Sequence, residues 1–112
     1  MNIRVGTDLV EIGRFKRKLD SSPSVLRELF SPHELQNADP IHLAGIFAAK
    51  EAVIKALDLA PGGWLKIEIS YQESGKPILK FSNNTRDKLD NFDLSISHDG
   101  NYVVAVFVVT LK

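Results

Sequence analysis

Three charged side chains interrupt a segment whose other residues are apolar or small. In AGIFAAKEAVIKAL, the residues Lys50, Glu51 and Lys55 stand among alanine, isoleucine, valine and leucine. In a helix, Glu51 and Lys55 share a face with Ala44 and Ala48, and these two alanines are expected to leave a shallow groove there. One interpretation is an exposed ion pair, which stabilises a helix by about 0.2–0.5 kcal/mol. The other is a carboxylate that stands beside the groove to hold a metal ion.

Asp8 supplies the second carboxylate that such a metal site needs. It lies in the predicted strand IRVGTDLV, where Gly6 permits another backbone to approach closely. Two carboxylates without a His or Cys partner suit a hard cation such as Mg²⁺, which completes its coordination shell with phosphate oxygens and water. Lys55, one turn after Glu51, would then neutralise phosphate charge. The residue types therefore indicate phosphate chemistry, provided that Asp8 and Glu51 meet in the fold.

A second group of charges lies in RFKRK, which places four cations within five residues. This run is typical either of a solvated helix face or of a docking surface for an acidic partner. On one face of a helix, Arg14 lies with Arg17 and Lys18 rather than with Lys16.

Helices and strands in mixed order must position these side chains. In SPHE, Ser31 and Glu34 have the spacing of a capping box, and Asp39 followed by Pro40 predicts the start of the main helix. The expected elements are a strand at 3–10, helices at 11–19, 23–30 and 40–59, strands at 64–71, 78–81, 92–98 and 102–111, turns at 73–77 and 99–101, and a short helix or loop within 82–91. The sequence predicts an α+β fold in which an antiparallel sheet packs on one long helix.

The composition limits the class of protein. The chain has 112 residues, of which 44% are apolar and 25% charged, and this predicts a single globular domain over 1–112. The absence of cysteine excludes disulfides, thiolate metal sites and a cysteine nucleophile. Fourteen basic and fourteen acidic residues cancel, which argues against general nucleic-acid binding. No apolar run has the length of a signal peptide or a membrane span, so no membrane association and a cytoplasmic location are expected.

Four segments together resemble one known family. They are GTDLVEIGRF at 6–15, LAGIFAAKEAVIKAL at 43–57, GKP at 75–77 and SISHDGNYVVAV at 95–106. In this order they resemble the holo-acyl-carrier-protein synthases, the small class of 4′-phosphopantetheinyl transferases, over nearly the whole chain. The most specific segment is FAAKEA followed by a lysine. The resemblance implies the 4′-phosphopantetheinyl transferase fold and a reaction in which coenzyme A donates its phosphopantetheine arm to a serine of an acyl carrier protein, with release of 3′,5′-ADP.

The resemblance also implies roles for the charged residues. Asp8 and Glu51 would hold Mg²⁺ against the pyrophosphate of coenzyme A, and Glu51, or a water that it holds, would accept the serine proton. Lys55 would stabilise the transferring or leaving phosphate. These roles fit phosphoryl transfer, which depends on positioning and charge neutralisation. Arg14 matches a family arginine on the surface that docks the acidic acyl carrier protein.

The same resemblance assigns contacts with coenzyme A to two other segments. Ser97 and His98 would contact its nucleotide end, and Gly75, Lys76 and Pro77 would help frame the donor pocket. Without the family pattern, a His at a strand end is more often a surface side chain, and GKP forms a plain turn equally well. Strand alternation puts Ser97 and His98 on opposite faces, so both reach one ligand only if the strand ends there and turns.

The sequence departs from the family pattern in three places. Ile46 stands where the family usually has arginine, which leaves Lys50 or Lys80 as the candidate compensating cation. The loop DLAPGGW replaces the usual glycine-threonine-glycine loop, and Gly62 and Gly63 either present N–H groups to a phosphate or form a turn that ends the helix. The chain is also shorter than usual before the main helix.

Family members form trimers with each site built between two subunits, and the segment YVVAVFVVTL is compatible with such a homotrimer. It is too apolar on both faces for a sheet with one wet side, so a helix is expected on one face and neighbouring subunits on the other. Two hypotheses follow. The retained Asp8, Glu51 and Lys55 favour a Mg²⁺-dependent transferase acting on coenzyme A and a carrier protein. Ile46 and the altered loop favour a non-catalytic relative that binds either one as an assembly or regulatory module.

Overall fold

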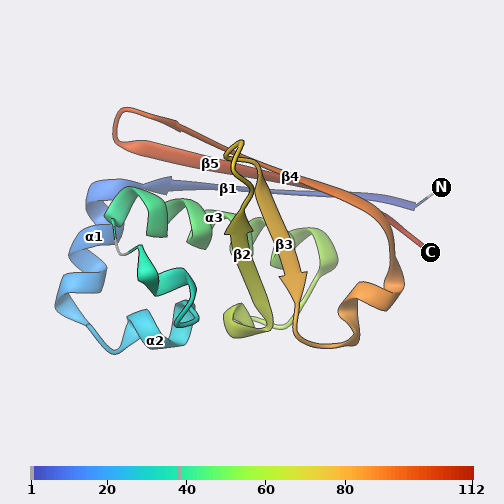
Figure 1. The fold of residues 1–112 in the computed structure, drawn as a ribbon, viewed down its shortest axis with the longest axis horizontal. Helices are drawn as coiled ribbons and strands as arrows, with labels where there is room; N and C mark the ends of the chain where they lie inside the picture. The colour runs from blue at the N-terminus through green and yellow to red at the C-terminus, as the bar shows by residue number, and fades with distance from the viewer. Residues whose placement is uncertain (1, 38) are drawn as a thin grey trace.

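The computed structural model describes residues 2–37 and 39–112 (Figure 1). Met1 and Ala38, which the predicted 1–112 domain includes, lie outside these ranges. The elements, with η for a 3₁₀ helix, follow in the order β1 (Asn2–Glu11), α1 (Ile12–Ser21), α2 (Val25–Leu29), η1 (Glu34–Gln36), α3 (Pro40–Leu57), η2 (Trp64–Lys66), β2 (Ile67–Tyr71), β3 (Pro77–Phe81), η3 (Asn84–Lys88), β4 (Leu89–Asp99) and β5 (Tyr102–Leu111). The predicted α+β class is confirmed.

The strands form two antiparallel sheets rather than one. The larger sheet has the order β1-β5-β4, and β2 pairs only with β3 in a separate hairpin. Figure 1 shows α3 running along the larger sheet, with the β2–β3 hairpin steeply inclined to the three long strands. The sequence predicted the strands and their antiparallel direction. It did not predict the division, because the alternation within a strand carries no information about which neighbour it pairs with.

Helix α3 begins and ends where its local chemistry dictates. The Asp39 side chain accepts a hydrogen bond from the N–H of Ile41 at 3.1 Å, and Pro40 occupies the first turn, where its missing N–H costs nothing. The helix ends at Leu57 because Asp58 adopts a left-handed conformation with φ of 52°. The observed end lies two residues before the predicted one at 59.

Strand β1 lies unusually close to α3, and Gly6 permits this. A Cβ atom on Gly6 would overlap the carbonyl oxygen of Ala52 and would lie 2.9 Å from the backbone N of Ala56. The expectation that Gly6 allows another backbone to approach is confirmed. Asp8, two residues along the strand, points to the same side as Gly6, so the close packing also brings Asp8 beside α3.

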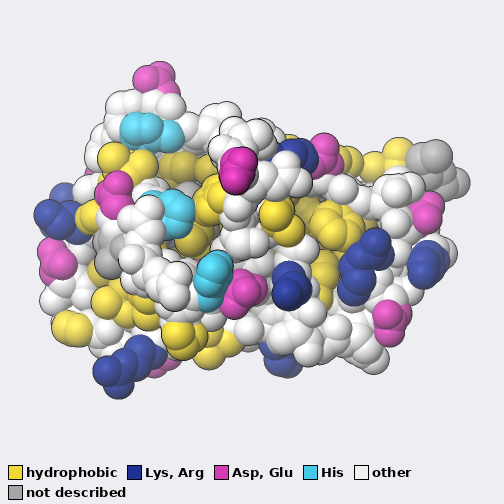
Figure 2. All heavy atoms as spheres, viewed as in Figure 1, with side chains coloured by type: hydrophobic (Ala, Val, Ile, Leu, Met, Phe, Trp, Pro, Cys, Tyr) yellow, Lys and Arg dark blue, Asp and Glu magenta, His cyan; other side chains and the backbone are white. Residues whose placement is uncertain are grey.

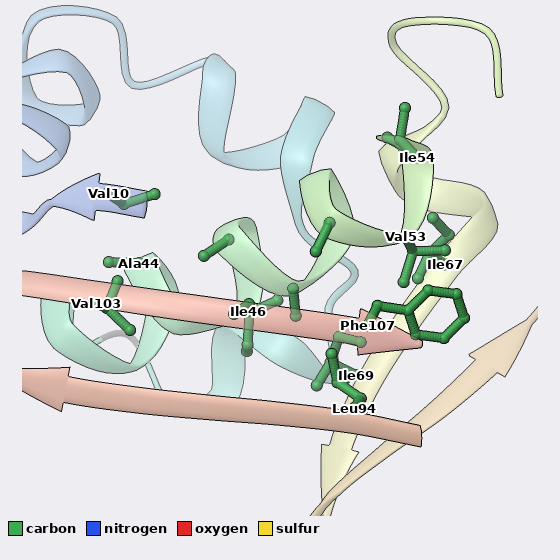
Figure 3. Close-up of a cluster of buried hydrophobic side chains, with 14 of the residues drawn as sticks. Val10, Ala44, Ile46, Val53, Ile54, Ile67, Ile69, Leu94, Val103 and Phe107 are labelled. Atoms are coloured by element: carbon green, nitrogen blue, oxygen red, sulfur yellow. The ribbon is translucent and has the colours of Figure 1, made fainter. Parts of the chain in front are cut away.

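The hydrophobic core lies between α3 and the two sheets. Figure 3 shows side chains from α3, β1, β2, β4 and β5 in this core, with Val53 of α3 near Phe107 of β5 and Ile67 of β2, and Ile46 further along α3. These four residues are at most 1% exposed. Burial of apolar surface on this scale is the main favourable term in the stability of the fold.

A buried ion pair connects α3 to the segment before it. The predicted capping box is confirmed, since the N–H of Ser31 donates to Glu34 Oε1 at 2.8 Å and the N–H of Glu34 donates to Ser31 Oγ at 3.2 Å. The capping box stands at the start of a short 3₁₀ turn, η1, and not of an α-helix. Glu34 also accepts hydrogen bonds from Lys50 Nζ at 2.7 Å and from the N–H of Ile69 at 2.9 Å. The carboxylate of Glu34 therefore joins η1, α3 and β2.

Several element boundaries differ from the prediction, and the largest changes lie between Trp64 and Asp99. Residues 64–66 form η2, so β2 begins at Ile67. Segment 82–91, for which either a short helix or a loop was expected, contains η3. The side chain of Asn83 caps the start of η3 by accepting a hydrogen bond from the N–H of Thr85 at 3.1 Å. Strand β4 extends from Leu89 to Asp99, beyond the predicted 92–98, because it pairs with almost the full length of β5.

The outer face of the larger sheet, which points away from α3, is exposed, with hydrophobic side chains on β1 and β5 and the polar Asp93, Ser95 and Ser97 on β4. Its large hydrophobic side chains include Leu9, Val5 and Ile3 of β1 and Val106 and Val108 of β5, all at least 40% exposed. Strand β5 is thus hydrophobic on both of its faces, as YVVAVFVVTL indicated, and the cover of its outer face by neighbouring subunits stays a prediction. The face drawn in Figure 2 differs, because acidic and basic side chains are interspersed on it. Within residues 2–37 and 39–112, no helix is long and apolar enough to cross a membrane.

Candidate active site

A cleft of about 730 Å³ opens where β1, α1, α2 and α3 meet. Asp8 of β1, Arg14 of α1 and Glu51 of α3 all line it. These are the two expected metal ligands and the expected carrier-docking arginine. The structure therefore places Asp8 and Glu51 in one cleft, and their sharing of a single cation stays a prediction.

Lys55 is paired with Asp8 rather than with Glu51. Its Nζ lies 3.0 Å from Asp8 Oδ1 and 3.0 Å from the carbonyl oxygen of Thr7, and both acceptors belong to β1. The Asp8 side chain is 16% exposed and that of Lys55 is 55% exposed. The exposed Glu51–Lys55 pair considered from the sequence is absent from the ion pairs of the described chain, because β1 offers Nζ two oxygens at once. Lys55 is not among the residues that line the cleft.

Glu51 is held by a residue that sequence reasoning missed. Its Oε1 accepts a hydrogen bond from Trp64 Nε1 at 3.2 Å. No signal in the sequence predicts this contact, because Trp64 follows a loop whose path only the fold determines. The predicted groove over Ala44 and Ala48 is wrong, since both are fully buried beneath the sheet. Phe47 and Trp64 line the cleft instead.

The cleft carries more negative than positive charge. Its ionisable lining consists of four carboxylates and two cations, namely Asp8, Glu11, Glu28, Glu51, Arg14 and Lys18. A bare phosphate would be repelled by this lining, whereas a divalent cation would be attracted. A cation bound here would in turn attract phosphate oxygens into the cleft.

The donor set fits Mg²⁺ only together with a phosphate ligand. Among the residues that the structure describes, no group of three or more His, Cys, Asp or Glu side chains is arranged to hold a metal by itself. Mg²⁺ does not require such a group, because it binds through one or two carboxylates and fills its shell with substrate phosphates and water. Asp8 and Glu51 are of the right type and number for this mode.

Gly62 and Gly63 lie at a different place from this cleft. They line a second cavity of about 210 Å³, together with Lys66 and residues at the end of β3. Gly62 has φ of +88°, a conformation that favours glycine, and this turns the chain after α3. Because α3 already ends at Leu57, Gly62 and Gly63 belong to a turn after the helix, and their contact with a phosphate stays a prediction.

The other expected coenzyme A contacts also lie outside the cleft. Gly75 and Lys76 form the turn that leads to Pro77 at the start of β3, and Lys76 Nζ lies 2.7 Å from Asp93 Oδ1 on β4. Ser97 and His98 are exposed near the end of β4. His98 Nε2 lies 3.0 Å from the carbonyl oxygen of Gly100. A single chain therefore does not bring these residues to Asp8 and Glu51.

The Lys76–Asp93 contact changes the acidity of the carboxyl group. The hydrogen bond from Lys76, then the N–H of Leu94 and the charge of Lys76, hold the pKa of Asp93 below its ordinary value of 3.8.

Neither candidate for the missing cation, Lys50 or Lys80, lines the cleft. Ile46 is fully buried in the core, so this position faces the sheet and not the cleft. Lys50 cannot compensate for a surface cation, because it is also fully buried and its Nζ is bound to Glu34 and to the carbonyl oxygen of Leu29. Burial lowers the pKa of Lys50 from 10.5, while the hydrogen bond to Glu34 opposes the shift. Lys80 is exposed on β3 and does not line the cleft.

Comparison with known proteins identifies relatives over the whole length of the chain. The family model described as 4′-phosphopantetheinyl transferase superfamily matches residues 4–107. A holo-[acyl-carrier-protein] synthase of Kocuria rhizophila is 42% identical over an alignment of 116 residues, which covers 97% of this chain and 92% of the relative. The synthase of Frankia alni is 36% identical over 112 residues, with 95% of each chain covered.

Solved structures match equally well. The Helicobacter pylori holo-[acyl-carrier-protein] synthase in complex with coenzyme A has a TM-score of 0.84 and 31% identity, covering 95% of this chain and 99% of that one. The Chronobacterium ammoniagenes complex with coenzyme A also has a TM-score of 0.84, with 29% identity over 100% of this chain and 99% of that one. The chain therefore belongs to the holo-[acyl-carrier-protein] synthase family of the 4′-phosphopantetheinyl transferase superfamily, as its four sequence segments predicted.

Proposed function

We propose that the protein transfers the 4′-phosphopantetheine group of coenzyme A to a serine of an apo acyl carrier protein, with Mg²⁺ as cofactor and release of 3′,5′-ADP. The observation that carries the proposal is the cleft lined by Asp8 of β1 and Glu51 of α3. Family membership supports the reaction, since relatives named holo-[acyl-carrier-protein] synthase align over nearly the whole chain. Solved relatives bound to coenzyme A support the donor.

Asp8 and Glu51 of the cleft, together with Lys55 beside Asp8, would have different roles in the reaction. Asp8 and Glu51 would hold Mg²⁺, which when bound neutralises the pyrophosphate oxygens of coenzyme A. Lys55 orients the Asp8 carboxylate, and its exposed side chain also lies near enough to Asp8 to reach a phosphate bound there. Glu51, or a water that it holds, accepts the proton of the carrier serine. The serine oxygen then forms the new bond to phosphorus while the bond to the departing 3′,5′-ADP breaks.

Cations at the mouth of the cleft suit an acidic carrier protein. Arg14 and Lys18 both lie on α1 and line the cleft. An acyl carrier protein brings its acceptor serine on a negatively charged surface, so these cations would steer the encounter and set its orientation. Arg17 is also exposed but lies 3.8 Å from Glu11, which reduces its free charge.

The active form in this proposal is a homotrimer. Supporting observations are the exposed hydrophobic side chains of β1 and β5 on the outer face of the larger sheet and the absence of the expected donor contacts from the lining of the cleft. Ser97, His98 and the turn at 75–77 of one subunit would contact coenzyme A bound in the cleft of its neighbour. Residues 1–112 would act as one domain, in the cytoplasm. Light scattering after gel filtration should give three times the chain mass of 12.4 kDa, and a monomer mass would contradict this assembly.

A non-catalytic module that binds coenzyme A or a carrier protein is the second candidate. The departure from the family pattern at Ile46 favours it, because the family usually has a cation at this position and neither Lys50 nor Lys80 supplies a cation to the cleft. Such a module would bind coenzyme A or the carrier protein but would not transfer the phosphopantetheine group.

One assay separates the two candidates. The protein is mixed with an apo acyl carrier protein, coenzyme A and MgCl₂, and the carrier is weighed by mass spectrometry. The transferase predicts a mass gain equal to phosphopantetheine that is lost in Glu51→Gln and in Asp8→Asn. Asp58→Asn is the matched control, because it removes a carboxylate at the end of α3 and outside the cleft. No gain with any carrier, together with measurable coenzyme A binding, would support the module.

A further inference from the structure

The indole group of Trp64 lies against the carboxylate that the proposed reaction uses. Trp64 Nε1 donates to Glu51 Oε1 at 3.2 Å, and both side chains line the cleft. An indole N–H can only donate, so its preferred partner in a partly buried place is an acceptor such as a carboxylate. Within residues 2–37 and 39–112, Glu51 Oε2 receives no hydrogen bond.

On the side away from Glu51, Trp64 is held in place by the backbone of η2, by the turn at Gly62 and by the hydrophobic core. Trp64 begins η2, where the N–H of Lys66 donates to the carbonyl of Gly63 at 3.2 Å, and the N–H of Ser82 donates to the carbonyl of Lys66 at 3.0 Å. A Cβ on Gly62 would lie 3.9 Å from Cζ3 of the indole, so this turn backs the ring. The ring also packs on the hydrophobic core.

A long acidic side chain in an open cleft needs such a contact to keep one orientation. Glu51 has three rotatable side-chain bonds, and its Oε1 has no bond to its helix neighbour Lys55, which is turned towards Asp8. A donor fixed on a separate element removes this freedom at one oxygen. The second oxygen then keeps a constant place in the cleft, as catalysis by positioning requires.

We propose that Trp64 is a positioning residue for Glu51. Its N–H holds Oε1 so that Oε2 is presented to the divalent cation and the reacting groups in the cleft. This inference rests on the proposed function for the role of Glu51, but the hydrogen bond and its effect on cation binding are measurable without turnover.

Trp64 is the only tryptophan in the chain, so its indole N–H gives a single NMR signal. In uniformly ¹⁵N-labelled full-length protein, Glu51→Ala should move this signal and speed the exchange of its proton with water. Glu28→Gln is the control, because it alters another carboxylate of the same cleft that has no bond to Trp64. Addition of MgCl₂ with coenzyme A should move the wild-type signal and leave that of Glu51→Ala in place.

Binding and kinetics test the positioning role itself. Trp64→Phe keeps an aromatic ring but removes the N–H, and it should weaken MgCl₂ binding in the presence of coenzyme A by about 10- to 100-fold in calorimetry. It should lower kcat by a similar factor and leave the KM for the carrier protein unchanged. Trp64→His should recover part of both losses, because His Nε2 occupies the same ring position as indole Nε1. Leu65→Ala, an exposed neighbour in η2 that lines neither cavity, should behave as wild type.

Two results would overturn the inference. One is an indole signal that is unchanged in Glu51→Ala, and the other is a Trp64→Phe variant with wild-type MgCl₂ affinity and wild-type kcat. A wild-type protein that modifies no apo carrier protein would instead defeat the proposed function, and the calorimetric comparison would still decide the positioning role. An active wild type with an unaffected Trp64→Phe would defeat the inference alone.

Discussion

At the scale of single residues, the chemistry of the cleft depends on how its two carboxylates are held. Asp8 is fixed by the ammonium group of Lys55, and Glu51 by the indole of Trp64. Lys55 of α3 binds Asp8 of β1, and Trp64 of η2 binds Glu51 of α3, so each contact joins two different elements. The orientation of both acids is therefore a property of the packed fold rather than of either segment alone.

Removal of the Lys55 charge should impair the reaction without unfolding the protein. Lys55→Met keeps the hydrocarbon part of the side chain but leaves Asp8 Oδ1 and the Thr7 carbonyl without their donor. We expect kcat/KM for carrier modification to fall about 10- to 100-fold, the usual cost of losing a group that orients a ligand. Lys88→Met, on the exposed η3, is the control and should match wild type. An unchanged rate in Lys55→Met, measured by mass gain of the carrier, would contradict this role.

Asp93 offers a test of the pKa argument outside the cleft. Because the folded-state pKa lies below 3.8, the ion pair with Lys76 stabilises the fold above about pH 4 and loses its effect as the pH falls through the folded-state pKa. In ¹³C NMR, the Asp93 carboxyl should titrate below 3.8 in the wild type and closer to 3.8 in Lys76→Met. Lys80→Met, also exposed but not bonded to Asp93, should leave the titration unchanged. Equal curves in all three proteins would refute the interaction.

Residue types indicated Asp8 and Glu51 as a candidate pair, and both line one cleft, whereas their hydrogen-bond partners could not be predicted. A carboxylate near a glycine in a strand and another on a small-residue helix are local features that can be read along the chain. The pairing of Lys55 with Asp8 and of Lys50 with Glu34 depends on which segments meet. Helical spacing indicated Glu51 as a partner of Lys55. In the structure Lys55 contacts β1 instead, because β1 provides two acceptors, Asp8 Oδ1 and the Thr7 carbonyl oxygen.

At the scale of elements, the contact between β1 and α3 brings Asp8 and Glu51 to the same cleft. Gly6→Ala places a Cβ where the carbonyl oxygen of Ala52 lies, so the strand must move away from the helix. We expect a loss of about 1–3 kcal/mol in the free energy of unfolding, together with a loss of carrier modification. Urea denaturation and the mass assay measure the two effects.

Gly13→Ala is the matched control for this substitution. A Cβ on Gly13 meets its nearest atom, Arg17 Nη1, at 3.4 Å, which is an ordinary contact with a flexible side chain. Since Gly13 lies in α1, alanine should be neutral or slightly stabilising there. Equal stability and activity of Gly6→Ala and Gly13→Ala would show that the close approach at Gly6 is unnecessary.

The buried pair of Lys50 and Glu34 fixes the segment around η1 on α3 and β2. Both side chains are fully buried, so Lys50→Met leaves the carboxylate of Glu34 without its counter-charge. We expect the free energy of unfolding to fall by about 3–5 kcal/mol, as when one partner of a buried pair is removed. The double variant Lys50→Met with Glu34→Gln should recover a large part, because no charge remains buried. A loss below about 1 kcal/mol in Lys50→Met alone, measured by urea denaturation, would contradict this account.

Element types followed from the sequence more closely than their arrangement did. Asp39–Pro40 predicted the start of α3, and the long β-branched run YVVAVFVVTL predicted β5. The separation of β2–β3 from the larger sheet could not be foreseen, because strand pairing between distant segments is decided by packing on α3. The same limit applies to η2, whose turn places Trp64 over the cleft.

At the scale of the whole molecule, the cleft and the outer sheet face call for different partners. The cleft combines carboxylates with Arg14 and Lys18 at its border, which suits a divalent cation, a phosphate donor and an acidic carrier. The outer face presents Leu9, Val106 and Val108 to solvent, and apolar side chains grouped in this way favour contact with another protein surface. A trimer would cover this face and bring the expected donor contacts of one chain to the cleft of the next.

The central claim is that Asp8 and Glu51 share one divalent cation. The most direct measurement is an anomalous difference map from crystals grown with MnCl₂ and coenzyme A, because Mn²⁺ substitutes for Mg²⁺ in oxygen-ligand sites and scatters anomalously. The account predicts one strong peak per cleft, within coordination distance of an oxygen of Asp8 and an oxygen of Glu51, with a phosphate of coenzyme A as a further ligand. A cleft that binds coenzyme A without a peak, or a peak that touches neither carboxylate, would contradict it.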